Sequence, residues 1–295
     1  MKPFLMKSLI LSAILFMVWI ILAQSCMTFR KADSEMKKEF EKNGVVLTTV
    51  TEKINGHTMH YAKTGADSLP TIYFIHGTPG SWDAFAGYLE DKELLQHYRL
   101  ISIDRPGFGY SDFGNARNLQ QQSELISPLF YQLGNGKPVY IAGHSLGGPM
   151  IIKLAADNPT LFSSLVILAG SVDPAEEKSE KWRPFLFKTP LNWLVPGAMR
   201  PSNEELWYLK KDLVRLKEDF KKVTCPVYIL HGNKDILVPV RNVEYAKNML
   251  INAASVTVTI FKGENHFIPW SKFKEIKEVL LRLPFHTIST HMSSQ

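Results

Sequence analysis

The sequence predicts an α/β domain built on a mostly parallel sheet. From about residue 70 onward, short apolar runs of strand length alternate with segments of helical spacing, which is typical of βαβ units. Polar residues suited to catalysis directly follow several of these runs, as they do in open α/β sheets. A length of 295 residues suits one large domain, with or without an insertion.

The first expected elements are antiparallel strands. Residues 45–50 and 57–61 are alternating apolar runs, and the pair Asn55-Gly56 between them is a strong hairpin signal. Further along, buried strands are expected at 70–75, 100–104, 139–142 and 161–168, with helices at 119–133 and 149–156.

The alternation of strand and helix stops after Asp173-Pro174. Residues 174–222 are rich in Trp, Lys, Glu and Pro, with helical spacing from Glu204 to Phe220, and indicate an insertion over one end of the sheet. The pattern resumes with strands at 227–230 and 256–261 and helices at about 239–250 and 272–281. We expect the domain to cover residues 45–285, followed by a polar tail at 286–295.

Composition excludes several classes of protein. Apolar residues at 45% and charged residues at 21% are ordinary for a globular chain. The net charge is +6, but the basic residues are dispersed and no zinc-finger or RNA-binding pattern occurs, so no nucleic-acid partner is expected. His57 and His60 are three apart on an expected strand and point to opposite faces, so no metal site is predicted. Gly107-Phe108-Gly109 lacks the third glycine of a dinucleotide fingerprint, and the oligomeric state stays open.

The N-terminus is typical of a targeting segment. Lys2 and Lys7 precede an apolar stretch from Ser8 to Ala23, which ends just before Cys26. Residues 1–26 are therefore read as a lipoprotein signal with a lipidated Cys26, an uncleaved membrane anchor or an ordinary cleaved signal. The first two readings are favoured, although Ala23 replaces the leucine usual in a lipoprotein cleavage box. We expect an exported, membrane-associated protein, with residues 27–44 as a linker.

The central chemical motif contains a candidate nucleophile. Residues 143–147 read Gly-His-Ser-Leu-Gly and fit G-x-S-x-G, between an expected strand and an expected helix. A serine on such a sharp turn projects its hydroxyl beyond the sheet, and the flanking glycines permit close approach of the backbone. Ser145 is the candidate nucleophile, whereas Ser111 lacks the second glycine.

A base and an acid follow later strands. His266 lies in the loop after the last strand, and Asp235 follows the strand at 227–230. A serine needs a base to take its proton, and a carboxylate then orients that base. Asp173 is a rival acid. The backbone amides of Thr78, in the loop 76–80, and of Leu146 are the expected oxyanion donors.

These motifs, with residues 104–111 (Asp-Arg-Pro-Gly-Phe-Gly-Tyr-Ser), resemble the α/β-hydrolase fold family over about residues 45–283. The resemblance implies an eight-stranded sheet, a helical lid after strand six (about residues 174–222) and no cofactor. Serine at position 145 argues against the dehalogenase and epoxide-hydrolase branches, which use aspartate there.

The predicted function is a serine hydrolase that cleaves a carboxylic ester (EC 3.1.1) of a small, apolar substrate through an acyl-enzyme. The expected pocket residues are Trp82, Phe108, His144 and Phe267. Aromatic residues of the insertion (Trp182, Phe185, Phe187 and Trp193) either line that pocket or pack the insertion on the domain. Thioester, lactone, peptide or C–C bond hydrolysis on the same triad stays open, as does a non-catalytic binding protein.

Overall fold

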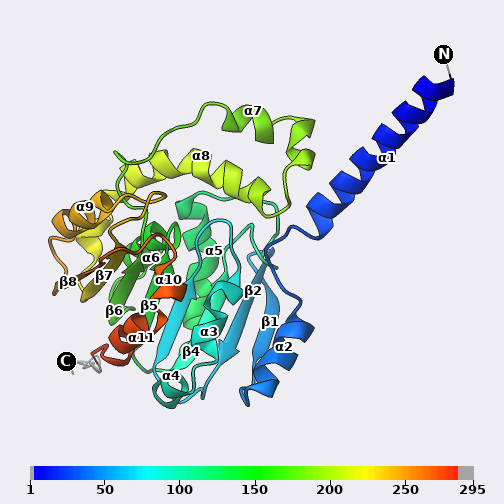
Figure 1. The fold of residues 1–295 in the computed structure, drawn as a ribbon. Coiled ribbons are helices and arrows are strands. Elements are labelled where there is room, and N and C mark those ends of the chain that lie inside the picture. The colour runs from blue at the N-terminus through cyan, green and yellow to red at the C-terminus, as the bar shows by residue number, and fades with distance from the viewer. Residues whose placement is uncertain (1–2, 285–295) are drawn as a thin grey trace.

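A computed structural model describes residues 3–284 as an eight-stranded sheet with helices on both faces (Figure 1). The expected polar tail at 286–295 lies outside these residues. The strands are β1 (Thr48–Ile54), β2 (His57–Thr64), β3 (Thr71–Ile75), β4 (Arg99–Asp104), β5 (Val139–His144), β6 (Ser164–Leu168), β7 (Val227–Gly232) and β8 (Val256–Phe261). Their spatial order is β1-β2-β4-β3-β5-β6-β7-β8.

Fourteen helical segments flank or precede this sheet in the described part of the chain. They are α1 (Pro3–Ser25), α2 (Asp33–Lys42), η1 (Trp82–Phe85), α3 (Ala86–Leu89), α4 (Lys92–His97), α5 (Leu119–Gln132), α6 (Gly147–Asp157), α7 (Arg183–Phe187), η2 (Pro190–Leu194), α8 (Met199–Leu216), η3 (Phe220–Lys222), α9 (Arg241–Met249), α10 (Ile268–Ser271) and α11 (Phe273–Leu281).

The sheet is parallel except at one edge, which confirms the predicted fold class. β1 pairs antiparallel with β2, and β2 with β4, whereas all other neighbours are parallel. The β1–β2 turn has positive φ at both Asn55 (51°) and Gly56 (81°), as a two-residue hairpin requires. β1 begins at Thr48 rather than residue 45, because Val45 and Leu47 are buried against a helix layer before the strand starts.

The core has two layers, one on each face of the sheet. Tyr73 and Ile75 of β3 pack with α5 and α6, whereas Ile72 and Phe74 pack with α3, α4 and α11. Alternate side chains of a strand point to opposite faces, so a strand covered on both sides is apolar throughout. This explains why the central strands are continuous apolar runs in the sequence.

The segment expected as a linker, residues 27–44, holds a helix that belongs to the folded body. Helix α2 buries Met36 and Phe40, and the ring of Phe40 lies 6.4 Å from that of Trp82. These two apolar residues, four apart in an otherwise charged segment, are too weak a pattern to predict the packing. By contrast, α1 projects away from the body (Figure 1).

The insertion lies between β6 and β7, as expected, and contains α7, η2, α8 and η3. Helix α8 crosses the end of the sheet (Figure 1), and its Leu209, Leu213 and Leu216 join the core. The helix begins at Met199, before the Glu204 that the spacing predicts. It therefore covers the edge at which the carboxyl ends of the parallel strands meet.

Two glycines allow β3, β5 and α6 to approach closely below this edge. A Cβ on Gly147 would lie 2.2 Å from the carbonyl oxygen of Ile75, and one on Gly143 would lie 2.2 Å from that of Gly147. Both obstacles are backbone atoms, which cannot move without separating the strands. The G-x-S-x-G spacing is therefore a packing requirement of this fold.

We predict that Gly143→Ala lowers the free energy of unfolding by about 4 kcal/mol or more, because the new methyl group meets backbone in a central layer. Gly136→Ala is the control: Gly136 has φ of 71° but open space around it, so it should cost only about 1–2 kcal/mol. Chemical denaturation of both variants measures the difference. Equal losses of unfolding free energy in the two variants would show that the close backbone approach at Gly143 does not determine stability.

Candidate active site

Ser145 occupies a strained turn between β5 and α6. Its φ is 56°, in the left-handed region that residues with a Cβ rarely adopt. The turn is held because the Ser145 amide donates to the carbonyl of Leu168 (2.9 Å), and its own carbonyl accepts from the amide of Gly148 (2.9 Å). The side chain is half-buried at the carboxyl end of the central strand.

Asp235 and His266 form a direct pair. His266 Nδ1 donates to Asp235 Oδ2 over 2.7 Å, and the other carboxylate oxygen accepts from the amides of Leu237 (2.9 Å) and Val238 (2.8 Å). The two loops meet at Gly232, where a Cβ would lie 2.4 Å from the Glu264 carbonyl oxygen.

The Asp235 carboxylate is held ionised. Burial raises the pKa of Asp235, but the contacts of His231 and His266 and the Val238 amide outweigh burial and bring its pKa well below the usual range. The rival acid Asp173 instead accepts from the amide of Ala175 in its own turn (2.8 Å). The geometry therefore pairs the candidate base with Asp235.

His144 connects this pair to the nucleophile turn. Its Nε2 donates to the carbonyl of His266 over 3.0 Å, and the two rings lie 4.7 Å apart. Burial, and then the neighbouring His266, lower the pKa of His144 to about 3, so this ring stays neutral. No hydrogen bond joins the side chains of Ser145 and His266 in the described residues; without substrate, such bonds are often long and tighten on binding.

The expected oxyanion loop lies against the nucleophile. A Cβ on Gly77 would be 2.8 Å from the Cβ of Ser145. Arg105 donates from Nη2 to the carbonyl of Gly77 (2.8 Å) and from Nε to that of His76 (2.9 Å). The peptide between Gly77 and Thr78 is trans, so the Thr78 amide points away from Arg105.

Neither expected oxyanion donor is used elsewhere in the described part of the chain. The amides of Thr78 and Leu146 donate to no other residue there. Arg105 therefore fixes the direction of one donor, and the turn at Ser145 fixes the other. Such preorganised donors stabilise a developing negative charge without reorganisation.

Arg105 also links this loop to the insertion. Its guanidinium forms a bidentate ion pair with Glu205 of α8 (2.8 and 2.9 Å) and donates to Gln122 of α5 (2.9 Å). Both members of the ion pair are fully buried. Sequence reasoning noted the Asp104–Ser111 motif but did not identify this role, because the partner lies 100 residues away.

We predict that Glu205→Gln lowers the free energy of unfolding by about 3–5 kcal/mol, because it leaves the Arg105 charge buried without its partner. Glu218→Gln breaks an exposed pair with Lys221 (2.7 Å) and should cost no more than about 1 kcal/mol. Denaturant titration of the two variants tests this. Similar small losses would mean that the buried pair is not required.

The expected pocket residues divide into two groups. Trp82 and Phe108 do not line an open pocket, because each is only 1% exposed: Trp82 belongs to a core layer, and Phe108 packs on His76 and Arg105. His144 is buried beside His266, whereas Phe267 is 52% exposed. An apolar residue close to a catalytic motif in the sequence can pack in the core as readily as it can line a substrate pocket.

Sequence reasoning missed Trp270, which lies beside this site. Its ring is 5.3 Å from that of His144, and its Nε1 donates to the carbonyl of Ala84 (3.0 Å). The only signal was its position four residues after His266. Trp270 and Phe267 together give the histidine side of the site an apolar, half-exposed rim.

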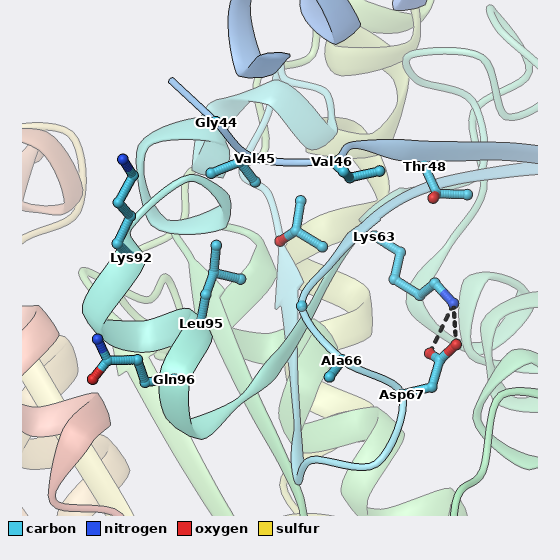
Figure 2. A pocket seen from close by; sticks show the side chains of 12 residues that line it. Gly44, Val45, Val46, Thr48, Lys63, Ala66, Asp67, Lys92, Leu95 and Gln96 are labelled. Carbon is cyan, nitrogen blue, oxygen red and sulfur yellow. Dashed lines mark hydrogen bonds and ion pairs between the residues drawn. The ribbon is translucent and has the colours of Figure 1, made fainter. Parts of the chain in front are cut away.

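A separate pocket of about 550 Å³ lies at the other end of the sheet. Figure 2 shows Lys63 and Asp67 paired at its wall, and Val45 and Leu95 also line it. Thr64 pairs with Leu100 near the start of β4, so this pocket opens at the amino end of the parallel strands. It contains none of the candidate catalytic residues.

Among residues 3–284, no group of three or more His, Cys, Asp and Glu side chains is arranged to hold a metal ion. The Asp235 carboxylate instead accepts from His266 Nδ1 and from the backbone amides of Leu237 and Val238. The arrangement presents a nucleophile turn, an acid–base pair and directed backbone amides.

Residues 70–196 match a model of the alpha/beta hydrolase fold, and the sheet order and the elbow agree with it. The chain has the α/β-hydrolase fold. Among solved structures, a membrane phospholipase A described as a bacterial virulence factor aligns with a TM-score of 0.61, covering 95% of this chain and 97% of that one. At 19% identity this likeness shows the shared fold alone.

Curated relatives of this α/β hydrolase include several kinds of enzyme. Epoxide hydrolase 1 of Caenorhabditis elegans is 30% identical over 44% of the chain, and monoacylglycerol lipase abhd6-B of Xenopus laevis is 29% identical over 58%. The matches span 33% and 50% of those two proteins. The shared fold and these relatives support a hydrolase scaffold, and they do not identify which bond is cleaved.

Proposed function

We propose that the protein is a serine hydrolase that cleaves a carboxylic ester of an apolar small molecule, with the insertion 174–222 as its lid. The observation that carries this proposal is the left-handed Ser145 turn, in contact with Gly77 and next to a preformed Asp235–His266 pair. A binding protein on the same scaffold has no need of a strained serine beside a paired histidine.

In this mechanism His266 Nε2 takes the proton of the Ser145 hydroxyl as its oxygen attacks the ester carbonyl carbon. The resulting oxyanion accepts hydrogen bonds from the amides of Thr78 and Leu146. His266 then returns the proton to the leaving alcohol, and an acyl-enzyme remains. Water, deprotonated by the same histidine, releases the acid and restores Ser145.

Asp235 supports each of these steps. Its hydrogen bond to Nδ1 holds the tautomer in which Nε2 of His266 is free to accept a proton, and its charge balances the imidazolium that forms. The resemblance to an epoxide hydrolase does not extend to chemistry here, because that branch uses an aspartate where Ser145 stands. Thioester, lactone, peptide and C–C substrates remain alternatives on the same triad.

We expect Ser145→Ala to abolish both ester hydrolysis and labelling by a fluorophosphonate probe. Asp235→Asn should retain the nucleophile but lower kcat by about 10⁴-fold, because the histidine is then held in the wrong tautomer. Asp173→Asn is the matched control and should remain active. Chromogenic acyl esters of increasing chain length measure these rates in the full-length protein.

Labelling that persists in Ser145→Ala would overturn the assignment of the nucleophile. Labelling without hydrolysis of any ester in the series would move the proposal to the other bonds cleaved by this triad. Equal loss of activity in the Asp173 and Asp235 variants would remove the reason for pairing Asp235 with the base.

We further propose that α1 is an uncleaved membrane anchor. By length and composition, Met6–Ser25 can cross a membrane, and almost none of it is buried. The end of the helix is nevertheless fastened to the body: Trp19 Nε1 donates to the carbonyl of Leu194 (3.0 Å), and Ala23 is fully buried. A segment removed on export would need neither contact.

An uncleaved anchor predicts that Cys26→Ser leaves the protein in the membrane fraction, with its N-terminal residues intact by mass spectrometry. The wild-type protein should show the same N-terminus, because the hydrophobic helix alone holds it. A mature chain that begins at a lipid-modified Cys26 would instead establish the lipoprotein reading, and a soluble mature chain would establish an ordinary signal peptide.

A further inference from the structure

The insertion carries a cluster of exposed apolar side chains that neither the core nor the site uses. Helices α7 and η2 contain no buried residue. Trp182 is 52% exposed, Phe185 66% and Trp193 53%. These residues therefore neither pack the insertion on the domain nor lie in a closed pocket. Several exposed aromatic side chains on one short segment indicate an interaction surface.

The charged residues within positions 181–200 are all basic. Residues 181–200, here called the apolar-basic segment, contain Lys181, Arg183, Lys188 and Arg200 and no acidic residue. Arg183 pairs with Glu180, but Lys181 and Lys188 form no ion pair within the described residues. Tryptophan, phenylalanine and leucine alternating with basic residues is the composition of a helix that lies in a membrane interface.

This segment is fixed to the end of the proposed anchor. Gln24 Nε2 donates to the carbonyls of Trp193 (2.8 Å) and Val195 (2.9 Å), and the Gly197 amide donates to the carbonyl of Ala23 (2.8 Å). Arg200 donates to Gln24 Oε1 over 2.7 Å. These hydrogen bonds hold the apolar-basic segment beside the C-terminal end of α1.

The surface of α1 continues into this segment. Phe16 and Ile20 of α1 and Pro190, Leu191, Trp193 and Leu194 of η2 line an apolar groove of about 540 Å³. A helix that crosses a bilayer would expose this groove to acyl chains, because its wall includes residues from the apolar part of α1.

We propose that the apolar-basic segment, residues 181–200, docks on an anionic bilayer beside α1, so that the hydrolase takes an amphiphilic ester directly from the membrane. This inference rests on the anchor and the hydrolase proposed above. The apolar-basic segment is followed directly by α8, whose Glu205 binds Arg105 behind the expected oxyanion loop. The segment that would rest on the bilayer is therefore joined directly to the helix that crosses the end of the sheet.

The docking can be tested by tryptophan fluorescence. Full-length Trp19→Phe protein is reconstituted in vesicles of phosphatidylcholine and phosphatidylglycerol, with and without bromine on the acyl chains. We expect brominated lipid to quench part of the emission. That quenching should be lost when Trp182→Phe and Trp193→Phe are added, and retained when Trp270→Phe, which removes a similarly exposed ring (49%) on α10, is added instead.

Flotation of the vesicles separates the two proposals. Protein that fails to float with the vesicles overturns the anchor and the docking together. Protein that floats but shows no quenching that depends on Trp182 and Trp193 overturns the docking and leaves the anchor standing. Quenching that disappears with Trp270→Phe would place the membrane on the wrong face of the molecule.

A kinetic comparison tests the consequence for substrate. Phe185→Glu should slow hydrolysis of a monoacylglycerol embedded in the same vesicles and leave a water-soluble short-chain ester unaffected, because the added charge opposes docking alone. Tyr131→Glu on α5, with nearly equal exposure of the ring (68%), should alter neither rate. Equal loss on both esters would assign Phe185 to the substrate pocket and overturn its role in docking.

Discussion

The buried guanidinium of Arg105 is the interaction on which the arrangement of the site depends. It satisfies the carbonyls of His76 and Gly77, the amide oxygen of Gln122 and both carboxylate oxygens of Glu205. Buried ion pairs contribute little net stability, because desolvation opposes the attraction, but their geometry is demanding. Here that geometry turns the peptide before Thr78 and ties α8 to the sheet. Arg105 therefore links the position of the loop 76–80 to that of α8.

The fold and the paired acid and base could be predicted from the sequence because their signals are local. A strand buried on both faces is an apolar run, and the glycines at 143 and 147 are required by backbone atoms only 2.2 Å from where a side chain would begin. Asp235 and His266 each follow a strand directly, so parallel pairing of β7 and β8 brings their loops together. In such cases the sequence neighbourhood determines the spatial neighbourhood.

The rest could not be predicted because it depends on contacts between distant segments. No sequence pattern around Glu205 predicts its ion pair with Arg105. The two apolar residues of α2 likewise do not distinguish a packed helix from a linker. Trp82 and Phe108 were expected in the pocket because aromatic residues near a motif suit an apolar substrate, yet both are core. An aromatic residue has the same sequence signature whether its ring faces ligand, protein or lipid.

The same ambiguity explains why relatives with different reactions resemble this chain equally well. An epoxide hydrolase matches it at 30% identity over 44% of the chain, and a monoacylglycerol lipase at 29% over 58%. In the mechanism proposed above, the reaction depends on one residue at the elbow, where Ser145 stands. The proposed lid is the insertion, whose residues 181–200 expose apolar and basic side chains and whose helix α8 buries Glu205. In the docking proposed above, the apolar-basic segment would contact the bilayer and the helix that follows it, α8, contacts Arg105 through Glu205. The location of the protein and its choice of substrate would then depend on two consecutive parts of one insertion.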